Sequence, residues 1–177
     1  MHPRLQDILT YLRRVRDDLT AVVDSHSASD FSRAPAAGWN GAQIIQHVGQ
    51  VEGSTTKMLE GLFARAMADG MPSDPETTSL LHSLDHLHVP DRTFRPIVAP
   101  QRLVPSTDTT LAPSWESLQQ VRVRTLNAVS TVDGRDLSSV SAPHPIFGAI
   151  NGYQWILFIG QHEERHLRQL RDALRAV

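Results

Sequence analysis

Residues 155–170 read WILFIGQHEERHLRQL, and this stretch gives the clearest indication of a helical fold. Apolar side chains recur in this stretch at steps of three and four residues, which is the period of an amphipathic α-helix. Asn151 followed three residues later by Gln154 forms a predicted capping box, so we expect a helix from Asn151 nearly to the C-terminus. His162 and His166 continue the apolar stripe, and this predicts that both imidazoles face inward.

The same periodicity occurs in three segments further upstream. They span residues 5–22, 40–69 and 114–133. Asn40 and Gln43 form a second predicted capping box at the start of the middle segment. Residues 70–113 hold seven prolines and are too long for a tight hairpin, so we expect them to cross the bundle.

This layout predicts an all-α protein, a four-helix bundle with a long crossover connection between its second and third helices. We expect one domain over residues 1–177, because a chain of this length can bury a sizeable core. No segment alternates with period two for long enough to predict a full strand. Short extended pieces are expected near Ile97 and Val98.

Composition excludes several classes of protein. The formal net charge is −2 with acids and bases interspersed, which gives no basic surface for nucleic acid. The chain has no cysteine, so disulfides, thiolate metal sites and cysteine nucleophiles are excluded. No apolar run reaches the roughly 18–20 residues of a membrane span, and no signal peptide is evident. We therefore expect a cytoplasmic protein without a nucleic-acid or membrane partner.

The nine histidines indicate a metal site. The i, i+4 spacing of His162 and His166 puts both imidazoles on one helix face, within reach of one ion. His47 lies one turn after Ile44 in the second helix and also faces inward, so the three could form a site with an open coordination position. The alternative is a set of core histidines that hydrogen-bond to their neighbours.

The stretch from His162 to His166 also fits the His-Glu-x-x-His motif of zinc peptidases. Only 11 residues follow His166, and they contain no histidine that could serve as a downstream third ligand. A peptidase is therefore disfavoured. A second cluster, His82, His86 and His88, lies in the proline-rich crossover and is expected to be solvated, whereas His144 lies in a rigid turn that could line the mouth of a pocket.

Two blocks of sequence resemble the DinB-like (YfiT-like) superfamily of four-helix metal-dependent enzymes. They are residues 38–48, which read GWNGAQIIQHV, and residues 144–155, which read HPIFGAINGYQW. The second block continues into Phe158 and the histidine pair. The resemblance implies a metal triad of His47, His162 and His166. It does not imply one reaction, because members resemble thiol-dependent transferases, hydrolases or isomerases.

These observations lead us to expect a metal-dependent transferase or hydrolase that acts on a small molecule. A divalent ion held by three neutral imidazoles (zinc, nickel, iron or copper) is a Lewis acid, and it could bind a low-molecular-weight thiol as its thiolate. Glu163, next to a ligand, is the candidate base, although it lies about 100° around the helix from its neighbours. Glu52 is expected in a surface or ion-pair role, and Arg165 is expected to be an ion-pair partner rather than an anion binder. The alternative is a non-catalytic metal- or ligand-binding bundle, and either protein could be a homodimer.

Overall fold

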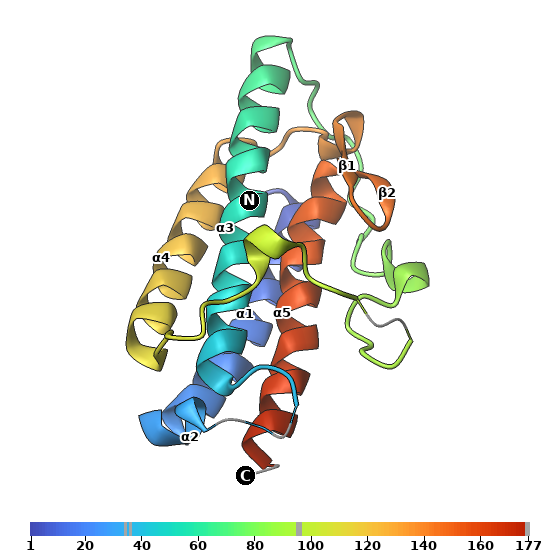
Figure 1. Ribbon diagram of the computed structural model, residues 1–177. Helices are drawn as coiled ribbons and strands as arrows, with labels where there is room; N and C mark the ends of the chain where they lie inside the picture. Colours follow the sequence, from blue (N-terminus) through green and yellow to red (C-terminus); the bar gives the residue numbers. More distant parts are fainter. Residues whose placement is uncertain (34, 36, 95–96, 176–177) are drawn as a thin grey trace.

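Five α-helices and a short β-hairpin make up the part of the chain that the computed structural model describes, residues 1–33, 35, 37–94 and 97–175. The long helices are α1 (Pro3–Asp24), α3 (Gly41–Ala68), α4 (Leu111–Ser130) and α5 (Gly152–Arg175), and they form the predicted four-helix bundle (Figure 1). The short helix α2 (Ala28–Ser32) lies in the connection between α1 and α3. Among the described residues, no helix combines the length and apolar character that crossing a membrane requires.

Both predicted capping boxes are present and fix the starts of two helices. Asn40 and Gln43 exchange side-chain to backbone hydrogen bonds of 2.9 and 3.0 Å at the start of α3. Asn151 and Gln154 do the same at the start of α5, with both distances at 3.0 Å. The third long helix, α4, begins at Leu111 rather than at the predicted Ser114, because proline is tolerated in the first turn of a helix.

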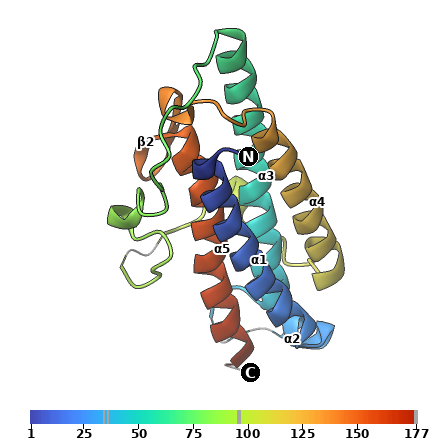
Figure 2. The same ribbon diagram turned by 180° about the vertical axis from the view of Figure 1, so that it is seen from behind.

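The contacts between the long helices determine which side of α5 faces α3. Helix α3 contacts both α4 and α5, and α1 contacts α5 on the side seen from behind (Figure 2). A Cβ atom at Gly160 would lie 2.7 Å from side-chain carbons of Tyr11 and Leu12, so the close approach of α1 and α5 requires a glycine there. This contact leaves the opposite side of α5 to face α3 and the crossover.

Buried apolar side chains form two clusters along the bundle, and four charged residues lie near the boundary between them. We call these residues the buried ion cluster: Arg16 of α1, Glu52 of α3, Arg122 of α4 and Glu163 of α5. Each long helix contributes one member. The two positive and two negative charges balance, which is the condition under which charges are tolerated in a core.

The crossover connects α3 to α4 along the open side of the bundle. It passes beside α5 and then crosses in front of α3 to reach α4 (Figure 1). Its early part is anchored by Asp74, which accepts hydrogen bonds from Arg4 and from the hydroxyl of Tyr153. The extended pieces expected near Ile97 and Val98 are not strands, and the Val98 side chain is 90% exposed. No partner strand lies beside them in the described residues, so the backbone has no ladder to join.

A β-hairpin that the sequence did not predict precedes α5. Strands β1 (Ser141–His144) and β2 (Gly148–Asn151) pair antiparallel, with His144 opposite Gly148. Gly148 has a φ of 77°, a left-handed conformation that glycine adopts at little cost. The strands are four residues each, and β1 contains Pro143, so alternation over this span is too short to predict them.

Candidate metal centre

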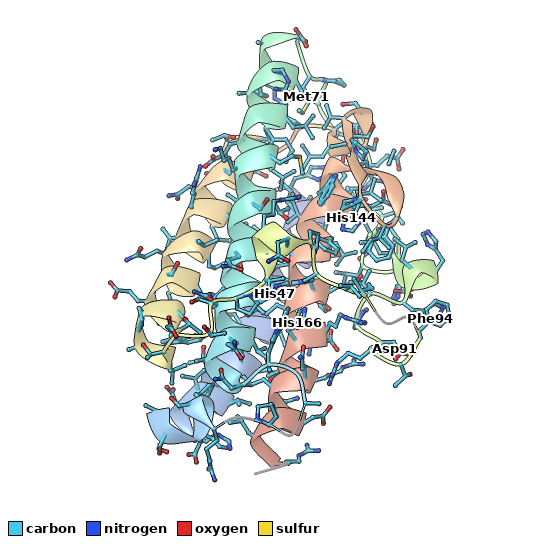
Figure 3. All side chains as sticks on the ribbon, in the orientation of Figure 1. His47, Met71, Asp91, Phe94, His144 and His166 are labelled. Carbon is cyan, nitrogen blue, oxygen red and sulfur yellow. The ribbon has the colours of Figure 1, made fainter. Side chains whose placement is uncertain are left out.

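Three histidines converge between α3 and α5. His47 comes from α3, and His162 and His166 come from successive turns of α5; one ring nitrogen from each lies within 4.8 Å of those from the other two. Figure 3 shows His47 and His166 close together in the space between these two helices. The ring centroid of His47 lies 5.3 Å from that of His162 and 4.7 Å from that of His166. The structure therefore brings together the three residues that the sequence singled out as ligands.

Hydrogen bonds orient two of the three imidazoles. Nδ1 of His47 lies 2.7 Å from the carbonyl oxygen of Leu103 in the crossover, and a carbonyl can only accept, so Nδ1 carries the proton. Nδ1 of His166 likewise donates to Oε1 of Gln169 at 2.8 Å. In both rings Nε2 is then left with its lone pair free. This arrangement, in which the outer nitrogen donates to an oxygen, is usual for metal-ligating histidines.

The surroundings of the cluster favour neutral imidazoles. Burial lowers the pKa of His166 to about 3, and the nearby His47 acts in the same direction. The pKa of His47 is lowered by burial, partly offset by its hydrogen bond to Leu103. Burial, followed by the two neighbouring histidines, holds the pKa of His162 well below its ordinary value. A metal ion binds the neutral form, so no proton need leave these rings at pH 7.

Trp39 closes one side of the histidine cluster. Its ring lies 4.7 Å from that of His47 and 6.5 Å from that of His166. The residue precedes the N-cap of α3, so the same capping box that starts the helix also places this ring. Trp39 therefore packs against the histidine cluster.

A cavity of about 720 Å³ opens onto the cluster. It lies between α3, α5, the crossover and the hairpin, and all three histidines line it together with His144. Its apolar wall includes Val51, Met58, Ile97, Phe147 and Phe158. The described lining residues also include three arginines, Arg92, Arg102 and Arg165, and no aspartate or glutamate. Arg92 is paired with Asp172 at 2.9 Å, so the cavity combines a largely apolar wall with an edge that carries arginines.

Glu163 points away from this cavity. Its carboxylate is fully buried and accepts hydrogen bonds from Nε of Arg16 at 2.6 Å and from the guanidinium of Arg122. Since one residue along a helix is about 100° of rotation, Glu163 faces α1 and α4 while His162 faces α3. It does not line the cavity. The residue predicted as a candidate base thus belongs to the buried ion cluster.

The structure also shows the surroundings of Glu52 and Arg165, the two other charged residues for which the sequence predicted ion-pair roles. Glu52 was expected in a surface or ion-pair role, and it is buried and paired with Arg122 at 2.7 Å and with Arg16 at 3.1 Å. Arg165 lines the cavity and donates to the backbone carbonyls of Val89 and Asp91 in the crossover. It therefore holds the crossover against α5 at the edge of the cavity.

The second group of histidines is separate from the metal centre. His82 lies in the crossover and pairs with Asp85 at 2.8 Å, with both side chains exposed. His88 has a φ of 50° and its ring lies 4.1 Å from that of Phe94. In the part of the chain that the structure describes, the histidine group able to hold an ion is that of α3 and α5. The expected solvated role fits these positions.

Sequence reasoning missed the groups that orient the ligands. The carbonyl of Leu103 comes from the crossover, 56 residues after His47, and no local pattern connects the two. Gln169 could have been found, because a residue three positions after a histidine lies beside it on a helix. Arg16 and Arg122 could also have been found, because Arg16 lies four residues after Leu12 and Arg122 lies four residues after Leu118. Both therefore interrupt an apolar stripe, and that spacing indicates burial.

Comparisons with known proteins agree with this architecture. A model of the DinB superfamily matches residues 11–170 of the chain. An uncharacterised protein of Bacillus subtilis, YuaE, is 27% identical over 135 residues, which are 76% of each chain. The crystal structure of TT2238, a four-helix bundle protein, superposes with a TM-score of 0.63 at 22% identity and covers 94% of this chain and 98% of its own. At that identity the likeness extends to the fold alone.

Proposed function

Because the chain belongs to the DinB superfamily and carries its three histidines on the wall of a cavity, we propose that it is a metal-dependent enzyme acting on a small molecule. The observation that supports this most directly is that Nδ1 of His47 and Nδ1 of His166 each donate a hydrogen bond to an oxygen, which leaves the Nε2 lone pair of both rings free to bind an ion. His47, His162 and His166 would hold a divalent ion, and the donor set fits one because neutral imidazole nitrogens bind zinc, nickel and iron alike.

A bound ion would supply the positive charge that lowers the pKa of a thiol or of water at the site. The residues around the ion would determine how strongly it acts and which ligand the cavity binds. Three neutral ligands would leave that charge uncompensated, and the apolar part of the wall would lower the local dielectric constant, which strengthens electrostatic interactions within the cavity. The arginines at the edge of the cavity favour an anionic ligand.

We propose a low-molecular-weight thiol as the reacting partner, with transfer of the thiol to an electrophile as the reaction and hydrolysis of a small substrate as the second candidate. Three ligands leave room for one further donor atom, which is the style of a catalytic site. The cavity of about 720 Å³ has the volume of ordinary small-molecule sites.

The position of Glu163 argues against a peptidase. In zinc peptidases with the His-Glu-x-x-His motif, the glutamate is the general base beside the metal. Here that carboxylate is held in the core by Arg16 and Arg122 and does not line the cavity. A base for the reaction would therefore come from the substrates themselves or from another residue of the cavity.

Metal analysis of the untagged protein tests the site. We expect one divalent ion per chain, lost in a His162→Ala/His166→Ala double variant. The matched control is His82→Ala/His86→Ala, because this pair has the same spacing but lies in the crossover outside the cluster. Undiminished metal in the first variant, or equal loss in both, would contradict the ligand assignment.

A paired screen then tests the reaction. The metal-loaded protein is given small thiols with electrophilic acceptors on one side and peptide and ester substrates on the other. We expect thiol transfer that His47→Ala abolishes. Peptide cleavage would refute the proposal, and metal binding without any turnover in either arm would favour the non-catalytic binding protein.

A further inference from the structure

His144 is the last residue of β1 and lies against α5 on the wall of the cavity. Its ring stacks on Phe147 at 4.5 Å and contacts Trp155 at 5.2 Å and Phe158 at 4.7 Å. The proposed reaction gives this histidine no role, and it is not one of the three ligands. Its aromatic neighbours fix the ring within the wall of the cavity.

The hairpin turn determines which nitrogen of His144 carries the proton. The backbone N–H groups of Ile146 and Phe147 both point at Nδ1, at 3.2 and 3.3 Å. Both are donors, so Nδ1 must accept and the proton lies on Nε2. Burial lowers the pKa of His144 to about 4, which is consistent with a neutral ring at pH 7.

The Nε2–H group of His144 has no hydrogen-bond partner among the described residues, yet it is not one of the buried unpartnered polar atoms. It is therefore accessible, and the accessible space beside His144 is the cavity. A fixed hydrogen-bond donor in a largely apolar wall is a typical feature of a ligand site.

Phe158 of α5 lies between His144 and the three-histidine cluster. Phe158 contacts His144 on one side and His162 at 5.5 Å on the other. Four residues of helix separate Phe158 from His162, a rise of about 6 Å. Figure 3 shows His144 nearer than His166 to the N-terminal end of α5. A ligand that reaches from the histidine cluster to His144 must therefore extend over about one helical turn.

We propose that His144 is a substrate-binding residue whose Nε2–H donates a hydrogen bond to a carbonyl or carboxylate oxygen of the substrate. The proposal rests on the function proposed above and refines its substrate class. The substrate would carry an oxygen acceptor about one helical turn from the atom that sits at the three histidines. A plain alkyl thiol would lack this contact, and a cationic group in the same position would be disfavoured.

Two substitutions separate the two nitrogens of His144. His144→Asn places an amide oxygen close to the position of Nδ1, so it keeps the acceptor for the hairpin turn and removes the donor. His144→Gln places an amide NH₂ group closer to the position of Nε2 and gives up the acceptor. A purely structural role predicts that Asn preserves and Gln impairs the protein, whereas the proposed role predicts the reverse for ligand binding. Ile146→Ala is the control, because Ile146 lines the same cavity and offers no side-chain donor.

The probes are N-acetylcysteamine, a neutral thiol with a carbonyl acceptor, and butane-1-thiol, which has none. Binding is followed by the thiolate charge-transfer band of the cobalt-loaded protein. We expect the wild type to prefer N-acetylcysteamine, and His144→Asn to reduce that preference by about three- to tenfold, the usual effect of one hydrogen bond. His144→Gln and Ile146→Ala should keep most of it. An unchanged preference in His144→Asn would overturn the proposal.

A second readout separates this proposal from the thiol chemistry. The Nε2–H signal of His144 is recorded by NMR in the zinc-loaded protein with butyrate, a carboxylate that contains no thiol. We expect the signal to shift. A shift without any cobalt–thiolate band would refute thiol activation but support His144, and no shift with either butyrate or N-acetylcysteamine would refute the role of His144.

Discussion

Replacing Glu163 by alanine distinguishes a structural carboxylate from a catalytic one. Glu163 is fully buried and accepts hydrogen bonds from both Arg16 and Arg122. Its removal leaves the two guanidinium groups with one carboxylate, Glu52, so a net positive charge stays in the core. Loss of one partner from a buried ion pair typically costs about 3–5 kcal/mol, because the remaining charge is desolvated without compensation.

This cost is measurable as a shift in melting temperature. For a chain of this size, 1 kcal/mol corresponds to about 2–4 °C, so we expect Glu163→Ala to melt about 6–20 °C below the wild type. The control is Glu60→Ala. Glu60 also pairs with an arginine, Arg124, but both side chains are exposed, and such surface pairs contribute about 0–1 kcal/mol.

The assay is thermal and urea unfolding followed by circular dichroism, with metal content and turnover measured well below the melting temperature. We expect Glu163→Ala to keep one ion per chain, because the carboxylate does not line the cavity. A variant with wild-type stability and no turnover would refute this reasoning and restore Glu163 as the base. Equal destabilisation by Glu60→Ala would show that the effect is not specific to the core.

Three further predictions concern the metal centre and the hairpin. Chelation of the ion should lower the melting temperature while helical circular dichroism persists, because four amphipathic helices already supply a core; complete unfolding would indicate a structural ion. Gln169→Leu removes the acceptor of His166 Nδ1 and should weaken zinc affinity by about 10–100-fold in a competition titration, with Gln119→Leu, at an exposed glutamine of α4, as the control. The pKa of His144 is lowered by burial to about 4, so the unfolded chain binds its proton first as the pH falls. The metal-free protein should therefore lose stability from about pH 6.5 down to pH 4, by up to about 3 kcal/mol from this group, and His144→Asn should lose less in urea unfolding at pH 7 and pH 4.5.

Local signals in the sequence were sufficient for the bundle. The two capping boxes, which start at Asn40 and Asn151, each lie within four consecutive residues of the sequence. Helices α3 and α5 begin directly after Asn40 and Asn151. The apolar period likewise requires no knowledge of neighbouring helices. The hairpin could not be predicted in this way, because β1 and β2 are stabilised by pairing with each other and by packing on α5. A strand of four residues is also too short to show a clear alternation of apolar and polar side chains.

The histidine positions could be predicted for the same local reason. His47, His162 and His166 occupy places in an apolar stripe, and a stripe determines which way a side chain points. Glu163 shows the limit of that reasoning, since adjacency in sequence to a ligand suggested chemistry that the helical rotation does not allow. Which partners surround Glu163 depends on α1 and α4, and no spacing within α5 contains that information.

The buried ion cluster and the metal centre use one segment of α5 in different directions. Between His162 and His166, Glu163 points toward α1 and α4, where two arginines hold its carboxylate. These ion pairs and the close contact of Gly160 with α1 both favour one rotation of α5 about its axis, the one in which the two histidines face α3. A rotation of α5 by even one residue position, about 100°, would carry both imidazoles off the cavity wall. The buried ion cluster therefore contributes to the orientation of the two histidines without contacting them, and because its own charges balance, it adds no net charge beside the cavity.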